Sequence, residues 1–188
     1  MHKIILASQS PRRKQLMELA ELEFEVVIAD VDETNPPGMP GDKVPGFLAM
    51  RKASEIKNKA EDAIIIAADT IVLLDHHILG KPKDAFHAKE MLQQLSGRMH
   101  QVVTGVCMQK SEKQICFSAI TEVYFRKLTD EQIDHYIKSY QPFDKAGAYA
   151  IQEWIGMIGI EKINGDYYNV MGLPIGEVVR VLNTEFIN

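Results

Sequence analysis

The chain has 188 residues, of which 46% are hydrophobic and 25% are charged. A chain of this length and composition can bury a substantial core, as one large domain or two closely joined lobes, and intrinsic disorder is excluded. The formal net charge of −5 argues against a general binder of nucleic acid or of acidic membranes, so we expect neither as a partner.

The first ten residues, MHKIILASQS, hold only a short apolar run. They lack the hydrophobic region and the cleavage site of a secretory signal, and no apolar stretch reaches the ~18–20 residues of a transmembrane helix. The two cysteines are too few for a disulfide framework, and no CxxC pair occurs. These features predict a soluble, cytoplasmic protein.

The first half of the chain alternates between predicted strands and helices, as judged from the period of its apolar residues. In chain order we expect a buried strand at 3–7, a helix at 10–20, a strand at 24–34, a proline-rich loop at 35–46, a helix at 47–62, a long apolar strand at 63–74, and a hairpin turn with a short return strand at 76–82.

The second half begins with a predicted helix and then a long hairpin. We expect a helix at 83–95, alternating strands at 98–109 and 113–128, a helix at 129–140, a loop at 141–152, a strand at 155–165 and a closing helix at 173–186. Thr129 and Gln132 form a capping box at the start of one helix. Together these elements predict an α/β fold with a mixed β-sheet.

The predicted first helix carries its charges in an unfavourable place. Ser10 is the expected N-cap, and the cations at 12–14 (RRK) follow at the end where the helix dipole is positive. Each cation costs about 0.3–1 kcal/mol there. A bound phosphate would offset this cost, held by Ser8, Ser10, Arg12, Arg13 and the helix amides. The alternative is a solvated basic patch paired with acidic neighbours.

A second anomaly lies in the longest apolar strand, where Asp69 and Thr70 interrupt AIIIAADTIVLL. A carboxylate in such a strand is costly unless it is paired or bound to metal. We interpret Asp69 as a base that activates water, or a metal ligand; the alternative is a carboxylate that accepts backbone N–H bonds. Asp30, Asp32 and Glu33 would supply further oxygen ligands for Mg²⁺ or Mn²⁺, although an acidic loop is often simply solvated.

Three further side chains are candidates for nucleotide contacts. Lys52 lies on the basic face of a predicted helix, and Lys81 follows a glycine in the turn GKP. Both lysines could bind phosphate as point charges. The alternative is that they are ordinary surface lysines. Gln152 can both donate and accept hydrogen bonds toward a base edge. In the same loop, Gly147 allows close approach of backbone to a ligand, or serves packing alone.

Seven motifs in order make the chain resemble the Maf family of nucleoside triphosphate pyrophosphatases over nearly its whole length. They are SQSPRR, VDET, AADTIV, GKP, SGR-H-VVTGV, DKAGAYAIQ and GDYYNVMGLP. The resemblance implies a single Maf-like domain over 1–188, with two lobes around a central cleft, similar to the inosine triphosphate pyrophosphatase fold. It also implies a divalent cation and hydrolysis between the α- and β-phosphates, which yields a nucleoside monophosphate and pyrophosphate.

The same resemblance assigns roles to individual residues. Asp69 matches the proton acceptor of the family, and Asp69 with Glu33 the metal-site carboxylates. Arg12, Thr70 and Gln152 stand where the dTTP/UTP subfamily has arginine, threonine and glutamine, and where the 7-methyl-GTP subfamily differs.

The chain departs from the family pattern at two positions. Ala150 and Glu153 stand where glycine is common, which affects the shape of the loop that carries Gln152. Two other functions remain as alternatives: a house-cleaning pyrophosphatase for modified pyrimidine nucleotides, and a nucleotide-binding regulator of cell division. The sequence also leaves a homodimer open.

The two cysteines are expected to face each other across the long hairpin. If Ser111 and Glu112 form a two-residue turn, paired residue numbers sum to 223, which places Cys107 opposite Cys116. We expect the thiols to stay reduced, because disulfides are rare in the cytoplasm.

Overall fold

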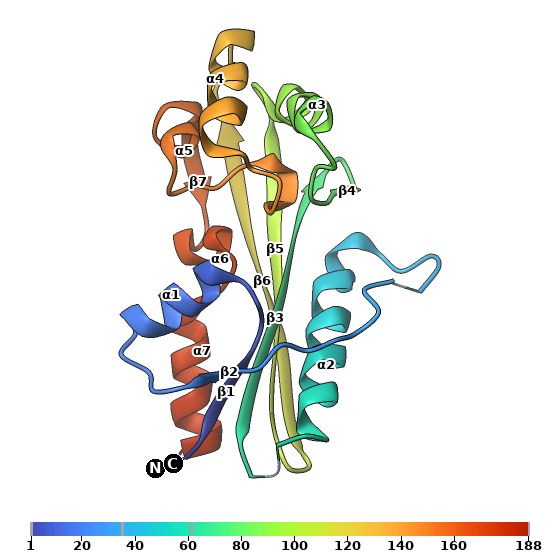
Figure 1. Cartoon of the computed structure of the whole chain (residues 1–188), viewed down its shortest axis with the longest axis vertical. Coiled ribbons are helices and arrows are strands. Elements are labelled where there is room, and N and C mark those ends of the chain that lie inside the picture. The colour runs from blue at the N-terminus through green and yellow to red at the C-terminus, as the bar shows by residue number, and fades with distance from the viewer. Residues whose placement is uncertain (1, 35, 61, 188) are drawn as a thin grey trace. The chain divides into compact units, whose positions relative to one another are not determined.

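The computed structural model describes residues 2–34, 36–60 and 62–187 (Figure 1). The chain divides into two compact units. The first comprises Met1–Thr70, Thr104–Ala119 and Gly172–Asn188, and the second Ile71–Val103 and Ile120–Met171. None of the helices in the described ranges is long and apolar enough to cross a membrane.

The first unit is built on short parallel strands covered by helices. Its elements are β1 (Ile4–Ala7), α1 (Pro11–Leu19), β2 (Glu25–Val26), the 3-10 turn η1 (Gly41–Lys43), α2 (Val44–Lys57), α7 (Ile175–Val181) and the π-helical turn η3 (Leu182–Ile187). Strand β1 pairs in parallel with β2 and with the first part of β3 (Ile64–Leu74), in the register Ile4 to Ile64.

The second unit contains two further antiparallel strand pairs. Its elements are β4 (His77–Leu79), α3 (Ala85–Leu95), α4 (Asp130–Tyr140), η2 (Ala146–Ala148), α5 (Trp154–Gly159), β7 (Ile160–Asn164) and α6 (Tyr167–Met171). Strand β4 pairs antiparallel with the end of β3, and β7 pairs antiparallel with the end of β6 (Lys113–Phe125).

Strands β3, β5 (Met99–Lys110) and β6 contribute residues to both units. The strand order is β2-β1-β3-β5-β6-β7, with β4 added to β3. Parallel and antiparallel pairs therefore occur in one sheet, which confirms the predicted α/β fold with a mixed sheet.

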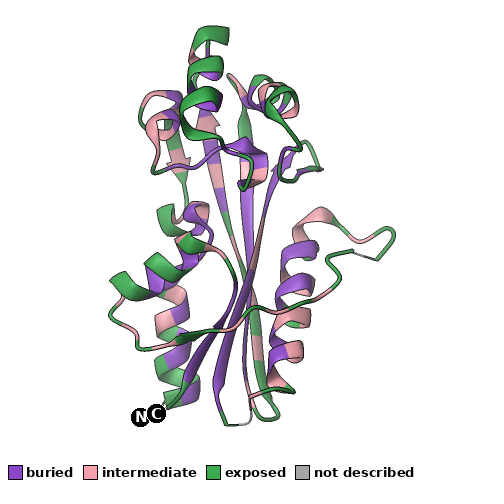
Figure 2. Cartoon of the chain, viewed as in Figure 1, coloured by how far each residue is buried: buried purple, intermediate pink, exposed green. Residues whose placement is uncertain are grey.

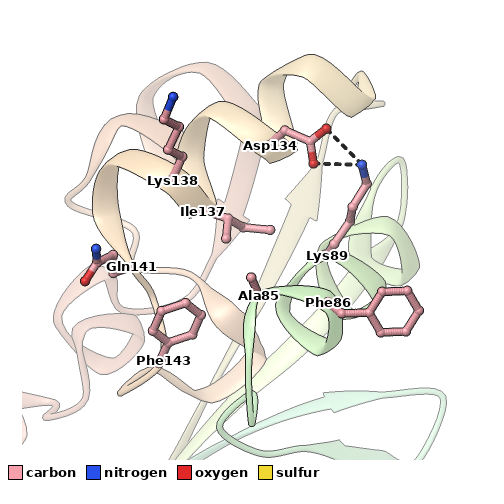
Figure 3. A pocket seen from close by; sticks show the side chains of 8 residues that line it. All are labelled: Ala85, Phe86, Lys89, Asp134, Ile137, Lys138, Gln141 and Phe143. Atoms are coloured by element: carbon pink, nitrogen blue, oxygen red, sulfur yellow. Dashed lines mark hydrogen bonds and ion pairs between the residues drawn. The ribbon is translucent and has the colours of Figure 1, made fainter.

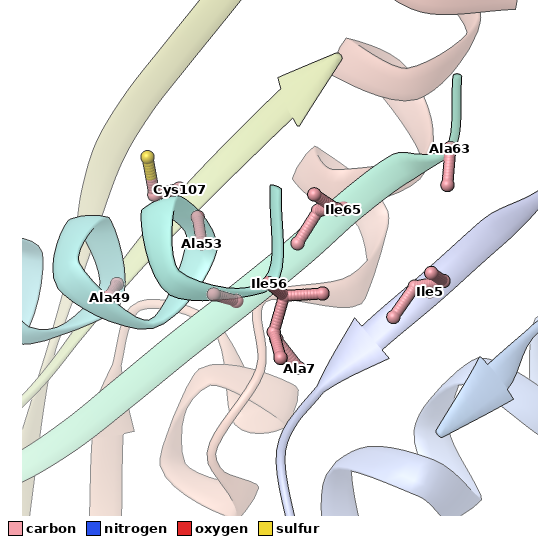
Figure 4. Close-up of a cluster of buried hydrophobic side chains, with 9 residues drawn as sticks. Ile5, Ala7, Ala49, Ala53, Ile56, Ala63, Ile65 and Cys107 are labelled. Atoms are coloured by element: carbon pink, nitrogen blue, oxygen red, sulfur yellow. The ribbon is translucent and has the colours of Figure 1, made fainter. Parts of the chain in front are cut away.

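Small side chains let helix α2 pack closely on the strands of the first unit. Ala49, Ala53 and Ile56 pack against β1 and β3 in a cluster that includes Ile65 and Cys107 (Figure 4). Figure 2 shows the buried face of α2 turned toward these strands. Alanine on the helix permits a short distance between helix and sheet.

Helix α2 also comes very close to β5 at Gly105. A Cβ atom there would lie 2.2 Å from the backbone nitrogen of Gly46, in the first turn of α2. Only glycine fits this contact. The position of α2, and of the side chains on it, is therefore fixed by backbone contact at its N-terminal end.

Most predicted elements are confirmed. Ser10 is the N-cap of α1 with Pro11 at the first helical position, and Thr129 and Gln132 form the capping box of α4. The turn between β3 and β4 has positive φ at Asp75 (48°) and His76 (69°), as a two-residue hairpin of this kind requires.

Three predicted boundaries are wrong. The strand at 24–34 is reduced to Glu25–Val26, and at its acidic end the Asp32 carboxylate accepts the N–H of Thr34 in a local turn. The predicted loop at 35–46 ends earlier than expected, because helix α2 already begins at Val44. Pro45 does not prevent this, since proline is tolerated in the first turn of a helix. Asn35, at the start of the predicted loop, lies outside the described residues.

The predicted strand at 155–165 is half helix. Residues Trp154–Gly159 form α5, and Gly156 within it lies so close to the Ile151 carbonyl that a Cβ atom would be 1.8 Å from its oxygen. Only Ile160–Asn164 form a strand. Leu19 of α1 is 69% exposed, because Arg13, Leu16 and Met17 form the buried stripe of this helix.

The two cysteines confirm one prediction and contradict another. The predicted turn forms at Ser111–Glu112, and Cys107 and Cys116 face each other with Cα atoms 4.1 Å apart. The structure joins them in a disulfide, so the prediction that they stay reduced is wrong. Opposed residues in an antiparallel pair come near enough for their sulfur atoms to bond.

A buried histidine lies in the core of the second unit. His100 is 1% exposed, its Nε2 lies 2.7 Å from the hydroxyl oxygen of Tyr149, and its ring packs edge-on against Phe125 and Tyr149. Its Nδ1 has no hydrogen-bond partner among the described residues. Burial lowers the pKa of His100 to about 3, because a protonated ring would lack a second acceptor.

We expect this histidine to make the fold acid-sensitive. In the unfolded chain His100 protonates near pH 6.5, whereas in the folded protein it does so only near pH 3. The unfolded state thus binds more protons, and the free energy of unfolding falls by up to ~1.4 kcal/mol per pH unit below about pH 6. Urea unfolding at pH 7 and pH 5 measures this difference. His100→Gln should reduce it, whereas His76→Asn, at an exposed turn, should not; an unchanged difference in His100→Gln contradicts the assignment.

Candidate functional site

The buried guanidinium of Arg13 connects three distant segments of the first unit. Its Nε donates to the carbonyl oxygen of Gly172 (2.8 Å), Nη1 to the hydroxyl of Ser8 (3.1 Å) and Nη2 to the hydroxyl of Thr70 (2.9 Å). Ser8 follows β1, Thr70 lies within β3, and Gly172 precedes α7. Three of the five N–H groups of Arg13 are therefore used inside the protein.

The hydroxyls predicted to hold phosphate also have partners in the protein. Ser8 Oγ accepts the N–H of Ser10 (3.2 Å) as well as the bond from Arg13. Ser10 Oγ, as the N-cap, accepts the N–H of Arg13 at 3.5 Å. The structure thus gives Arg13, Ser8 and Ser10 a scaffolding role that the sequence did not predict, while their contact with phosphate stays a prediction.

The neighbouring cations differ in burial. Arg13 is 9% exposed, and loss of hydration lowers its pKa, an effect opposed by the nearby Asp69 carboxylate. Arg12, one residue earlier, is partly exposed. The predicted pair of arginines therefore divides into one internal residue and one at the surface.

Asp69 lies within reach of a second cation. Lys52 Nζ, on α2, is 2.7 Å from Asp69 Oδ1 and 2.8 Å from Glu33 Oε1. The side chains of Lys52 and Asp69 are 12% and 16% exposed, whereas that of Glu33 is 60% exposed. The structure thus brings together three residues predicted from separate motifs, and the two carboxylates converge on one positive charge.

The other acidic residues of the same segment point elsewhere. The Asp32 carboxylate accepts the N–H of Thr34 (2.9 Å) and lies 4.0 Å from Arg51, and hydrogen bonding to Thr34 lowers its pKa. Asp30 is exposed. Of the predicted cluster, Glu33 is the residue that the structure places beside Asp69.

The donor set around Lys52 fits a divalent metal of the magnesium type. Within residues 2–34, 36–60 and 62–187, no group of three or more His, Cys, Asp and Glu side chains could hold a metal ion. Mg²⁺ is commonly held by one or two carboxylates, with substrate phosphates and water completing its coordination. Glu33 and Asp69 supply two such carboxylates, and both lie within 3 Å of the Lys52 ammonium, at 2.8 and 2.7 Å.

Thr70, the residue after Asp69, belongs to a hydroxyl network. Its Oγ1 lies 2.9 Å from Thr104 Oγ1 and donates to the carbonyl oxygen of Gly172 at 3.2 Å. Thr104 is fully buried. Neither Thr104 nor Gly172 was predicted from the sequence to belong to the site. Thr104 could have been found, because it is a polar residue inside the apolar run VVTGV.

The remaining two predicted site residues, Lys81 and Gln152, lie in the second unit, and both are exposed. Lys81 follows Gly80, whose carbonyl oxygen accepts the N–H of Gly147 at 3.0 Å. A Cβ atom on Gly147, whose φ is +67°, would lie 2.9 Å from the Val72 side chain. The glycine of the DKAGAY motif therefore allows close packing against Val72 of β3, while its N–H is bonded to the turn that carries Lys81.

A separate hollow of about 560 Å³ opens between α3 and α4 (Figure 3). Phe86, Ile137 and Phe143 provide its apolar lining, and Lys89 pairs with Asp134 at its edge. The eight described residues that line it include none of the predicted site residues. The hollow therefore adds nothing to the site around Asp69.

Comparison with known proteins identifies the family of the chain. The sequence model of the Maf-like protein family matches residues 3–185. The chain belongs to this family. The chain is 53% identical over 183 residues to a dTTP/UTP pyrophosphatase of Bacillus cytotoxicus, covering 97% of this chain and 95% of that protein. It is 49% identical over 176 residues to a dTTP/UTP pyrophosphatase of Phocaeicola vulgatus, covering 93% and 91%.

The fold also has a more distant structural relative. A HAM1 protein from Coxiella burnetii superposes with a TM-score of 0.53 at 16% identity, covering 97% of this chain and 99% of that one. At this identity the likeness concerns the fold alone, and it agrees with the mixed-sheet α/β architecture of this member of the Maf-like family.

The two arginines give a matched pair of variants. Arg13→Met should lower the free energy of unfolding by about 2–4 kcal/mol, because it leaves the buried Ser8, Thr70 and Gly172 groups without their donor. Arg12→Met, at a partly exposed position, should change it by less than ~1 kcal/mol and should instead raise KM for the nucleotide. Urea unfolding and pyrophosphate-release kinetics distinguish the two. Equal stability losses in both variants would contradict the division of roles.

Proposed function

We propose that this member of the Maf-like family hydrolyses dTTP and UTP to the nucleoside monophosphate and pyrophosphate. The relatives at 53% and 49% identity are named dTTP/UTP pyrophosphatases, and the match extends over nearly the whole chain. The observation that carries the proposal is the cluster of Asp69, Glu33 and Lys52, which combines a candidate base, two carboxylates for a metal and a cation for phosphate.

In the proposed reaction Asp69 accepts a proton from the water that attacks the α-phosphorus. Its position supports this role, because the side chain is mostly covered and is held by Lys52 at 2.7 Å. The backbone around it is rigid, since Asp69 lies within an eleven-residue strand and Thr70 beside it is bonded to Arg13 and Thr104. A base held in this way needs little reorganisation before it takes the proton.

Glu33 and Asp69 are the proposed ligands of a divalent cation, Mg²⁺ or Mn²⁺. Such an ion neutralises phosphate charge and lowers the pKa of water bound to it. The protein's own contribution is to present the two carboxylates on either side of Lys52. Lys52 then interacts with the triphosphate as a point charge.

Further phosphate contacts are proposed for Arg12 and Lys81, which are at least partly exposed. Contacts with phosphate are also proposed for Ser8, Ser10 and Arg13. They would use the donors and acceptors that these side chains do not already use in bonds within the protein. The base is proposed to be distinguished by Arg12, Thr70 and Gln152, the positions at which the subfamilies differ.

The alternatives from sequence analysis are tested by one substrate panel. Pyrophosphate release should be fastest with dTTP and UTP, with Mg²⁺ or Mn²⁺ present. Faster turnover of modified pyrimidine triphosphates would favour house-cleaning, and tight binding without turnover would favour the regulatory role. We propose cytoplasmic action without nucleic-acid or membrane partners, consistent with the net charge of −5; a homodimer stays a prediction.

Replacing Asp69 by Asn tests the base directly. Turnover of dTTP should fall at least ~10²-fold, because the amide keeps the shape of the carboxylate but cannot accept the proton. Stability in the absence of metal should hold, since Lys52 keeps its pairing with Glu33. Stopped-flow or coupled pyrophosphate assays and thermal melting measure the two quantities. Near-normal turnover in Asp69→Asn would show that Asp69 is structural.

The acidic segment offers a matched pair for the metal. Glu33→Gln should weaken Mn²⁺ binding at least ~10-fold, because it removes one of two converging carboxylates. Asp32→Asn, in the neighbouring turn, should change the affinity much less, since Asp32 contacts Thr34 and Arg51 instead. Calorimetric titration of the nucleotide-free protein with Mn²⁺ provides the comparison. Equal affinity in Glu33→Gln and the unmodified protein would remove Glu33 from the metal site.

A further inference from the structure

Gln152 lies in a tight turn of the second unit. The N–H of Glu153 donates to the carbonyl oxygen of Ala150 at 3.1 Å, which closes a four-residue turn with Ile151 and Gln152 in its middle. Ile151 is 6% exposed and anchors the turn in the core, whereas Gln152 is exposed. The geometry of this turn therefore decides where the Gln152 amide is presented.

One buried hydroxyl holds both ends of this turn. Tyr136, on α4, is fully buried, and its hydroxyl oxygen accepts the N–H of Ala150 at 3.2 Å. The same hydroxyl donates to the carboxylate of Glu153. The first and last residues of the turn are thus bonded to a single atom of a helix, which restricts both the position and the tilt of the turn.

Lys145 holds the Glu153 carboxylate from a second direction. Its ammonium lies 3.4 Å from Glu153 Oε1 and 2.8 Å from Asp144 Oδ1, and its side chain is only 9% exposed. The side chain of Glu153 is 23% exposed. Because the pair is largely shielded from water, its charges attract more strongly than in an exposed salt bridge.

Glu153 is not used to cap the helix that it precedes. It occupies the N-cap position of α5, but its side chain accepts no bond from the first amides of that helix. Its carboxylate turns to Tyr136 and Lys145 instead. Glu153 is also one of the two positions at which the chain departs from the glycine common in the family pattern.

We propose that Tyr136, Glu153 and Lys145 form a brace that sets the position of Gln152 and thereby the selectivity of the site for the base. They are positioning residues, since each acts on the substrate through Gln152. The inference rests on the proposed function, in which Gln152 reads the base. It extends that function by naming what orients the reading side chain in this chain.

A double-mutant cycle between Tyr136 and Gln152 tests the brace. The measured quantity is the ratio of kcat/KM for dTTP to kcat/KM for CTP. Tyr136→Phe should lower this ratio at least ~5-fold, because the turn loses its common anchor at both ends. Gln152→Ala should lower it further, and Tyr136→Phe should then have no additional effect on the ratio.

Glu153 supplies a second measurement that does not depend on Tyr136→Phe folding well. Glu153→Gln keeps an acceptor for the Tyr136 hydroxyl and loses the charge opposite Lys145, so it should retain more selectivity than Glu153→Ala. Asp134→Asn is the matched control, because it removes an ion pair with Lys89 from the same helix α4. Its selectivity ratio should stay within about twofold of the unmodified protein.

The outcomes separate the brace from the proposed function. If Gln152→Ala changes the ratio while Tyr136→Phe and Glu153→Ala lower only the melting temperature, the brace is structural and the inference fails. Additive effects of Tyr136→Phe and Gln152→Ala on the ratio would also overturn it. If Gln152→Ala leaves the ratio unchanged, base reading by Gln152 fails, and the brace with it. Absence of pyrophosphate release from the unmodified protein would refute the proposed function itself.

Discussion

The first unit depends on the burial of one guanidinium. Arg13 joins the end of β1, the middle of β3 and the segment before α7, and its partner Gly172 lies 159 residues away in the sequence. A buried cation is tolerated only when its N–H groups have acceptors, so Ser8, Thr70 and Gly172 must all be in place. Asp69, next to Thr70, takes its position from the same constraint.

The internal bonds of Arg13 also change how the three cations at the start of α1 are explained. Three cations at the positive end of α1 suggested a ligand as their common partner. In the structure Arg13 is bonded internally, and Lys14 lies 3.6 Å from Glu18 one turn later. Part of the unfavourable helix-dipole energy is therefore offset within the protein, without any ligand.

The sequence predicted what is encoded locally. The periodicity of 63–74, the capping box at Thr129 and the hairpin register of the cysteines all follow from neighbouring residues, and all are confirmed. The strand at 24–34 is wrong over most of its length, and its acidic end forms a local turn at Asp32 instead. Asp69 stood out as an anomaly and Glu33 as a candidate ligand. The contacts of Lys52 with both, and of Tyr136 with the Gln152 turn, join distant segments, and no local pattern specifies them.

Two lysines are each paired with two carboxylates, and the two arrangements differ in how many other bonds hold the carboxylates and in how exposed they are. Around Lys145, the Glu153 carboxylate is fixed by the Tyr136 hydroxyl and lies on a closed turn. Around Lys52, the Glu33 side chain is 60% exposed and follows an irregular segment. The second arrangement permits Glu33 to exchange an ammonium for another cation at little structural cost, whereas the first does not. Under the proposed function, the carboxylates around Lys52 are therefore suited to metal and phosphate, and those around Lys145 to holding the turn that carries Gln152.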